Sequence, residues 1–364
     1  MSVIQQIFQD HAPACLECFG KDIPEAHRKT MAAIRECRTG LRGQHVFQCP
    51  NCGDWKMTDS SCGNRHCPAC QNGKAAQWVY RQQLSLLPCT YFLATFTLPE
   101  ALRETTRSNQ RIVYKALMDC AADSLRTLEA DKRFVGAHTA GFSGVLHTWG
   151  RQMQYHPHAH FVIPGGGLSR NQDRWVPASG HFLVHVRALS KMFRGKMRDA
   201  LAKAGLLDDV PAEVWRRDWV VHCKPVGDGR ATMKYLGAYV FRVAVSDSRI
   251  AGYDGENVVV RYQKVGSSRW RQIKLSAFEF IRRYLQHVLP SGFMKIRHYG
   301  FLSPNFSVPI QRIRELICVL YEVLRDKLPR IEPPQPRPLR CPSCSTVMRC
   351  TGFLPNVPLI GSSP

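Results

Sequence analysis

The segment Leu146-His-Thr-Trp-Gly-Arg-Gln-Met-Gln-Tyr-His-Pro-His-Ala-His-Phe-Val-Ile163 carries four histidines within fourteen residues, and its pattern predicts a β-hairpin. Residues 141–147 and 158–163 predict two strands, and residues 150–155 the turn between them. Alternate side chains of a strand share a face, so His158 and His160 project together. If the turn is centred near residues 152–153, His147 lies opposite His158, with Cβ atoms roughly 4.5–5.5 Å apart.

This hairpin gathers three imidazoles, which predicts a catalytic site for a divalent metal ion at His147, His158 and His160. Three protein ligands leave coordination positions open, as catalysis requires. His156 falls on the same face and could replace one ligand, because Pro157 leaves the start of the strand open. Two other metal folds fit less well. Metallo-hydrolases need Asp-His where Phe161-Val162 stand, and no cupin-like Glu and His pattern follows.

Residues 229–245 predict a helix with two stripes. Leu236, Val240 and Val243 form the apolar stripe, and Tyr235, Tyr239 and Arg242 form the second. Residues four apart are neighbours on a helix, so both phenols face one site. Packing at the edge of the core is the alternative. Beside a metal site in a basic chain, we interpret Tyr235 and Tyr239 as catalytic nucleophiles for a phosphate, with Lys234 or Arg242 as candidate helpers.

The cysteines predict structural zinc. Cys49-Pro-Asn-Cys52 and Cys67-Pro-Ala-Cys70 are two C-x-x-C pairs, and two such pairs can place four thiolates around Zn²⁺. The candidates for a second zinc are Cys15, Cys18, Cys37 and Cys62, with His45 and His66 as further donors. The tail offers three thiols, Cys341, Cys344 and Cys350, so a fourth ligand there is missing or comes from elsewhere.

The charge of the 364-residue chain favours a polyanionic partner. It has 50 Lys and Arg against 28 Asp and Glu, a formal net charge of +22. Nucleic acid or an acidic membrane surface would suit such an excess. No stretch approaches the ~20 apolar residues of a membrane-spanning helix, and the start lacks a signal-peptide pattern. We therefore expect a cytoplasmic protein without a membrane partner, in which clustered cysteines are metal ligands rather than disulfides.

The remaining pattern predicts an α+β protein of four parts. We expect a zinc-binding domain at 1–75, a central domain at 85–250, an α/β extension at 251–330, and a linker with a cysteine-containing tail at 331–364. Further predicted strands span 90–98, 257–262 and 270–274, and further predicted helices span 103–128, 186–204, 276–288 and 310–328. Five prolines between 329 and 340 mark the linker.

Four motifs in combination resemble the rolling-circle transposases of bacterial insertion sequences (family ninety-one), which belong to the HUH endonuclease superfamily. The resemblance covers residues 10–330. The motifs are Cys37-Arg-Thr-Gly40 with Ser61-Cys-Gly-Asn-Arg-His-Cys-Pro-Ala-Cys70, Val145-Leu-His-Thr-Trp149 with His156-Pro-His-Ala-His160, Lys234-Tyr-Leu-Gly-Ala-Tyr239, and Phe280-Ile-Arg-Arg-Tyr-Leu-Gln-His-Val-Leu-Pro290 with Lys295-Ile-Arg-His-Tyr-Gly300.

The resemblance implies an RNA-recognition-like HUH nuclease core, an antiparallel sheet with flanking helices, after a small zinc-binding domain. It implies nicking and rejoining of single-stranded DNA at transposon ends and at target DNA, with Mg²⁺ or Mn²⁺ and a 5′-phosphotyrosine. His158 and His160 match the family's metal pair, while His147 as third ligand comes from the hairpin phasing. Some relatives use one tyrosine. With no helicase domain in the chain, a host helicase is a candidate partner, and the protein would associate with the nucleoid.

Three rival functions stay open at this level. A replication initiator or relaxase would use the same chemistry on another DNA site. A zinc-dependent DNA-binding regulator would need neither tyrosine. A zinc hydrolase of small molecules would leave the charge excess and the tyrosine helix without a role. The sequence does not define the oligomeric state.

Overall fold

The computed structural model describes residues 2–240, 244–264, 266–322, 332–334 and 338–356. They fall into two compact units, which we describe separately. The cysteine unit combines residues 1–77, 241–288 and 333–364, and the histidine unit combines residues 78–240 and 289–332. The segment 251–330, expected to form one extension, is thus divided after Val288 between the two units.

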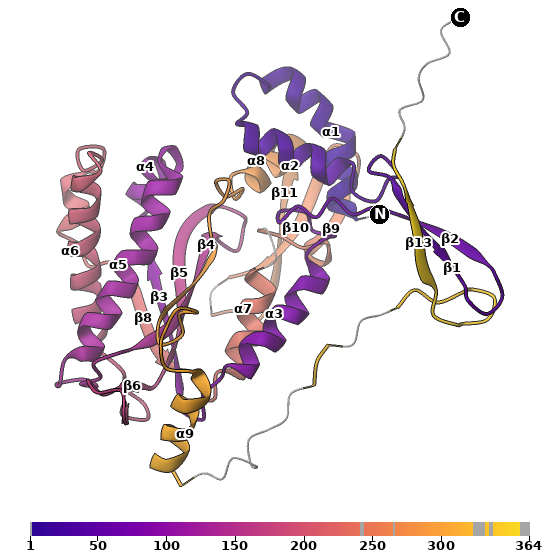
Figure 1. The fold of residues 1–364 in the computed structure, drawn as a ribbon. Helices are drawn as coiled ribbons and strands as arrows, with labels where there is room; N and C mark the ends of the chain where they lie inside the picture. The colour runs from indigo at the N-terminus through magenta and orange to yellow at the C-terminus, as the bar shows by residue number, and fades with distance from the viewer. Residues whose placement is uncertain (1, 241–243, 265, 323–331, 335–337, 357–364) are drawn as a thin grey trace, which may run out of the picture. The chain divides into compact units, whose positions relative to one another are not determined.

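The histidine unit is built on a five-stranded antiparallel sheet with strand order β12-β4-β5-β3-β8 (Figure 1). Its strands are β3 (Tyr91–Thr97), β4 (Gly141–Trp149), β5 (Tyr155–Pro164), β8 (Val221–Pro225) and β12 (Ile296–Gly300). The predicted strand at 90–98 is confirmed as β3. Together with the helices that flank this sheet, the antiparallel pairing confirms the expected α+β class.

One face of this sheet is covered by α5 (Gln110–Ala130) and α6 (Val186–Lys203). The core between sheet and helices includes Phe96, Phe142, Phe161 and Phe193, all fully buried. Burial of these large apolar side chains is the main force that holds the layer together. The sequence predicted one helix over 103–128; the structure divides it at Asn109 into α4 (Arg103–Ser108) and α5.

The opposite face of the sheet carries α7 (Arg230–Val240), which lies beside β4. The buried positions of α7 include Thr232, Leu236 and Val240, spaced four residues apart. Residues 241–243, where the predicted helix continues with Arg242 and Val243, lie outside the described residues, and Ala244 and Val245 are not helical.

Smaller elements complete the histidine unit. They are the last part of α3 (Asn72–Leu84), the 3₁₀ turns η1 (Glu100–Leu102) and η2 (Ala212–Trp215), the hairpin of β6 (Gly166–Leu168) and β7 (Trp175–Pro177), and α9 (Ile310–Leu320). The helix predicted over 310–328 ends at Leu320, and residues 323–328 lie outside the described part of the chain.

The cysteine unit contains two three-stranded antiparallel sheets. The first joins β1 (Gln44–Gln48), β2 (Trp55–Asp59) and β13 (Arg349–Leu354), so both ends of the chain contribute to it (Figure 1). The second joins β9 (Ile250–Tyr253), β10 (Asn257–Gln263) and β11 (Trp270–Ser276). The helices are α1 (Val3–Phe19), α2 (Glu25–Arg35) and α8 (Ala277–Leu285), with the 3₁₀ turn η3 (Asp247–Arg249).

Apolar packing explains why residues 251–288 belong with the N-terminus. Phe8 of α1 stacks edge-on against Tyr284 of α8, with ring centroids 5.2 Å apart. The Tyr284 hydroxyl, fully buried, donates a 2.7 Å hydrogen bond to the carbonyl of His66. Among the described residues, no helix has the length and apolar character needed to cross a membrane.

Candidate functional site

The β4–β5 hairpin has the register that the sequence predicted. His147 pairs directly with His158, and the tight turn follows between Gly150 and Gln154, whose backbone groups share a 2.9 Å hydrogen bond. Met153 takes a left-handed conformation in this turn (φ 62°). The pairing register shifts between His147 and Trp149, because the two strands have unequal numbers of residues there. The hairpin therefore presents the three histidines on one face.

His147, His158 and His160, called here the histidine triad, converge closely. One ring nitrogen from each lies within 4.8 Å of the others. The ring centroids are 4.6 Å apart for His147 and His160 and 4.9 Å apart for His158 and His160. His156 contributes through its backbone, since its carbonyl accepts a 2.7 Å hydrogen bond from Nδ1 of His158. The donor set fits one divalent ion with open positions.

His158 and His160 each make a hydrogen bond through Nδ1 rather than Nε2. Because a carbonyl only accepts, His158 carries its proton on Nδ1 and keeps a lone pair on Nε2. Nδ1 of His160 shares a 2.9 Å hydrogen bond with the hydroxyl of Thr95. Partners of this kind orient imidazole ligands toward a metal ion.

Burial keeps the triad uncharged. It lowers the pKa of His158 to about 3 and that of His160 to about 4. The pKa of His147 falls well below its usual range, first through burial and then through the neighbouring His160 and His158. A neutral imidazole is the form that binds metal ions. The triad is therefore in its ligand form at neutral pH.

Three residues next to the triad were not among the predicted site residues, although Trp149 and Lys295 fall within motifs of the family resemblance. Thr95 lies on β3 directly across from His160. Trp149 stacks on His147, with ring centroids 5.2 Å apart and an interplanar angle of 14°. Lys295, just before β12, places its Nζ 4.6 Å from the Trp149 ring centre. The pairing of strands distant in sequence brings Thr95 and Lys295 close to the triad.

The triad lies on the same face of the sheet as the tyrosine helix. The core side chains on β4 and β5, such as Leu146, Ala159 and Phe161, point toward α5 and α6, so the alternate positions with the histidines point the other way. The Nζ of Lys295 donates a 3.1 Å hydrogen bond to the carbonyl of Val240. Lys295 thus links the last turn of α7 to Trp149, which stacks on His147.

Both predicted tyrosines belong to α7. Tyr235 is 47% exposed and lies next to the buried Leu236. Tyr239 immediately precedes Val240 in the last turn, and its side chain lies outside what the structure describes. Lys234 is exposed. The helix that carries both tyrosines therefore lies on the face of the sheet that also holds the triad, and Tyr235 on it is about half exposed.

The structure assembles the cysteines into two groups of four that differ from the predicted sets. Cys67 and Cys70 meet Cys37 and Cys62, whereas Cys49 and Cys52 meet Cys341 and Cys344 of the tail. Within each group the sulfur atoms lie within 4.8 Å of one another. The expectation that Cys49, Cys52, Cys67 and Cys70 share one ion is thereby corrected, because the two pairs lie at different ends of the β1–β2 hairpin region.

Cys15 and Cys18 join neither group, which corrects the predicted second set of Cys15, Cys18, Cys37 and Cys62. Cys15 continues the buried stripe of α1 formed by Ile4, Phe8 and Ala12, and burial raises the pKa of its thiol to about 11. It is a core residue that favours the protonated form.

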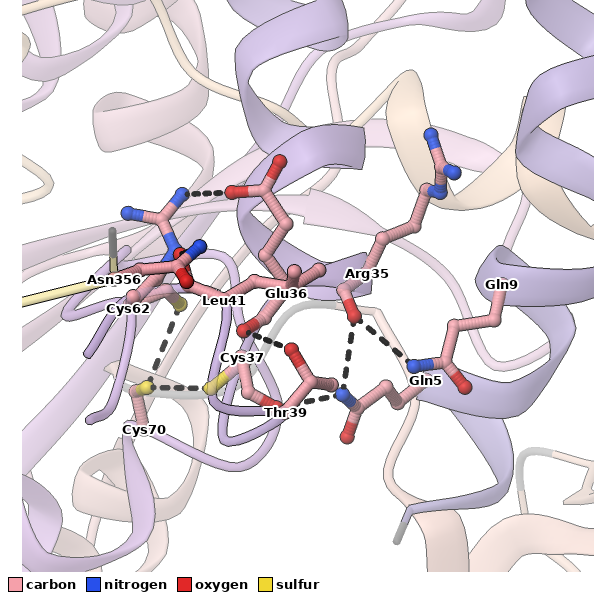
Figure 2. A network of polar contacts seen from close by, with 11 residues as sticks. Gln5, Gln9, Arg35, Glu36, Cys37, Thr39, Leu41, Cys62, Cys70 and Asn356 are labelled. Carbon is pink, nitrogen blue, oxygen red and sulfur yellow. Dashed lines mark hydrogen bonds and ion pairs between the residues drawn. The ribbon is translucent and has the colours of Figure 1, made fainter. Parts of the chain in front are cut away.

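The group of Cys37, Cys62, Cys67 and Cys70 forms next to the end of α2. Figure 2 shows three of these residues, Cys37, Cys62 and Cys70. The Sγ of Cys70 is 3.4 Å from that of Cys37 and 3.5 Å from that of Cys62. From α1, the Gln5 side chain donates to the carbonyl of Cys37 (2.6 Å) and Gln9 to that of Arg35 (3.0 Å). These bonds fix the backbone from which Cys37 projects.

Comparisons with known proteins show which family the sequence resembles. A family model described as "Putative transposase" matches residues 141–308, and another described as "Transposase zinc-binding domain" matches residues 7–98. The protein named "Putative transposase y4qJ" from Sinorhizobium fredii (strain NBRC 101917 / NGR234) is 39% identical over 301 residues, covering 77% of this chain and 75% of the relative. No solved structure matches the chain.

A second relative is the transposase for insertion sequence element IS801 from Pseudomonas savastanoi pv. phaseolicola. It is 31% identical over 296 residues, which cover 76% of this chain and 70% of the relative. The protein is thus a transposase, an enzyme acting on DNA, with an N-terminal zinc-binding domain. It belongs to the IS91 family of transposases.

Proposed function

We propose that this transposase nicks and rejoins single-stranded DNA at the ends of its insertion sequence, with Tyr235 or Tyr239 as nucleophile, in rolling-circle transposition. The proposal rests chiefly on one observation. Lys295 connects the carbonyl of Val240, beside Tyr239, to the Trp149 ring that stacks on His147. Helix α7, which carries both tyrosines, and the histidine triad thus lie on the same face of one sheet.

The phenol of a tyrosine suits strand transfer because its attack exchanges one phosphate ester bond for another, and the DNA strand can therefore be rejoined later. Its Oη forms a bond to the scissile phosphorus and gives up its proton, the bond from phosphorus to the 3′ oxygen breaks, and that oxygen takes up a proton. The products are a 5′-phosphotyrosine and a free 3′-hydroxyl. A 3′-hydroxyl can later attack the phosphotyrosine, which reverses the steps and releases the phenol without ATP. Two tyrosines would allow two such links in sequence.

We infer that the histidine triad would hold Mg²⁺ or Mn²⁺, which would polarise the phosphate oxygens and stabilise the charge that develops on them. The chain itself supplies the orientation. Thr95 and the carbonyl of His156 hold the imidazoles, and Lys295 adds a positive charge between the triad and α7. The net charge of +22 favours DNA as the partner, and a host helicase could supply the single strand.

Covalent capture of labelled DNA tests the proposal. We expect a denaturant-resistant adduct with 3′-end-labelled single-stranded transposon-end DNA and Mg²⁺, while a 5′ label is released on a fragment with a 3′-hydroxyl. Replacing the tyrosine that acts as nucleophile, by Tyr235→Phe or by Tyr239→Phe, should abolish the adduct because its Oη is removed. The double variant should lose the adduct whichever of the two tyrosines attacks. Tyr321→Phe, at another partly exposed tyrosine of the same unit, is the matched control and should leave it unchanged.

Two outcomes would contradict the proposal. An adduct that persists in the double Tyr235→Phe, Tyr239→Phe variant would exclude both phenols. An adduct that retains the 5′ label would mean the opposite polarity of cleavage.

A further inference from the structure

We propose that Cys49, Cys52, Cys341 and Cys344 form a second zinc site, one that fastens the C-terminal segment to the N-terminal β1–β2 hairpin. The matched zinc-binding family model ends at residue 98, so it contains only one half of this ligand set. The other half lies almost 300 residues further along the chain. We call the four residues the terminal cluster. This inference does not depend on the proposed DNA chemistry.

The sulfur atoms of the terminal cluster have the spacing of a zinc site. The Sγ atoms of Cys49 and Cys344 are 3.4 Å apart, as are those of Cys52 and Cys341, and those of Cys52 and Cys344 are 3.6 Å apart. Tetrahedral Zn²⁺ with Zn–S bonds near 2.3 Å separates its sulfurs by about 3.8 Å. A disulfide would need about 2.05 Å. The geometry is therefore close to a ligand cage and far from two disulfides.

The two halves of the cluster have the same local structure. In the first, the N–H of Gly53 donates to the carbonyl of Cys49 (3.1 Å). In the second, the N–H of Ser345 donates to the carbonyl of Cys341 (2.9 Å). Both donors follow the second cysteine of their pair and have left-handed backbones, with φ 79° at Gly53 and 61° at Ser345.

The equivalence extends one residue further. The N–H of Cys49 bonds to the carbonyl of Asp54 (2.7 Å), and the N–H of Cys341 bonds to that of Thr346 (2.9 Å). Each C-P-x-C turn thus directs two thiols to one point. Ser345 has a left-handed backbone conformation, which favours glycine and is strained for a residue with a side chain. A metal ion that draws both thiols inward would offset that cost.

The C-terminal segment buries few apolar side chains, so apolar burial alone contributes little to its folding. Every residue of β13 is exposed, although the strand pairs with β1 from Gln44↔Leu354 to Gln48↔Arg349. The small core beneath it consists of Cys49, Cys341 and Met348, with Phe47, Leu339 and Cys344 packed against it. Two of its three fully packed members are themselves cysteines of the cluster. In so small a core, a metal ion supplies folding free energy that side chains cannot.

Zinc content of full-length variants tests this site directly. The measurements use a His158→Ala, His160→Ala background, so that zinc at the triad does not count. We expect two zinc ions per chain, one at each cysteine group. Cys52→Ser and Cys341→Ser, at opposite ends of the chain, should each remove one zinc, and the double variant should lose that same one. The matched control is Cys350→Ser, at an exposed thiol of β13 outside the cluster, which should keep both.

Alkylation of the unmutated protein provides an independent readout if a variant fails to fold. Cys49, Cys52, Cys341 and Cys344 should be protected together and become reactive together when a chelator removes zinc, while Cys350 reacts throughout. The proposal is overturned if Cys341→Ser retains both zinc ions. It is equally overturned if Cys341 and Cys344 react as fast as Cys350 while Cys49 and Cys52 stay protected.

Discussion

At the scale of single residues, the histidine triad is oriented by groups that are not themselves candidate ligands. The hydroxyl of Thr95 bonds Nδ1 of His160, and the carbonyl of His156 fixes the tautomer of His158. Loss of such a partner typically lowers metal affinity by about 10–100-fold. They come from β3 and from the hairpin itself, so the fold of the sheet sets the geometry of the site.

Thr95→Val removes the hydroxyl but keeps the shape and β-branching of the side chain. We expect it to lower the affinity of the triad for Mn²⁺ about 10–100-fold, because His160 loses the group that orients it. Titration calorimetry with Mn²⁺ measures the change. Thr95→Ser restores the hydroxyl and should recover most of the affinity. Equal affinity for wild type and Thr95→Val would mean that this bond does not support a metal site.

At the scale of secondary-structure elements, local pattern predicted those features that arise within one hairpin or helix. The pairing of His147 with His158 follows from the two-residue period of strands and the length of the turn. The same reasoning located α6 and the β10–β11 hairpin closely. It failed at Asn109, which interrupts a continuous helical pattern, because nothing in the apolar periodicity marks the break.

Helix α5 carries a buried carboxyl group, and its effect on the free energy of unfolding should depend on pH. Glu129 is fully buried, and neither carboxylate oxygen has a hydrogen-bond partner among the described residues. Burial therefore raises its pKa well above the usual value. Above the pKa of the unfolded chain, about 4.3, the unfolded state loses this proton while the folded state retains it. The contribution of Glu129 to the free energy of unfolding is thus fully present below that pH and declines as the pH rises.

Glu129→Gln resembles the protonated carboxyl and removes this dependence. We expect the variant to melt at a higher temperature than wild type at pH 7, with the difference shrinking to nothing near pH 4. Thermal unfolding of both proteins across this range measures it. Glu104→Gln, at an exposed position of α4, is the control and should show no such trend. A Tm difference for Glu129→Gln that is independent of pH would contradict a protonated buried carboxyl.

At the scale of the whole molecule, sequence spacing could not assign the cysteine groups. Spacing places Cys49 and Cys52 nearest to Cys67 and Cys70, whereas the fold brings them to Cys341 and Cys344. The pairing of β13 with β1 brings the C-terminal cysteines next to Cys49 and Cys52. Likewise, Lys295 reaches Trp149, which stacks on His147, because β12 pairs with β4. Contacts of this range follow from topology, which local periodicity does not encode.

Under the proposed function, the histidine triad and the tyrosines of α7 act together on one phosphate of a DNA strand, and the net charge of +22 favours binding of that strand. Membership of the IS91 family establishes the transposase. The central claim of the proposal is narrower, namely that a phenol of α7 becomes joined to the 5′ side of the cut.

Mass spectrometry of the trapped complex tests that claim most directly. Wild-type protein is reacted with single-stranded transposon-end DNA and Mg²⁺, digested with nuclease and protease, and its peptides are sequenced. We predict a nucleotide 5′-phosphate attached to Tyr235 or Tyr239 and its absence when His158→Ala, His160→Ala protein is used. A nucleotide found on any residue outside α7, or formed equally well without the two histidines, would contradict the account.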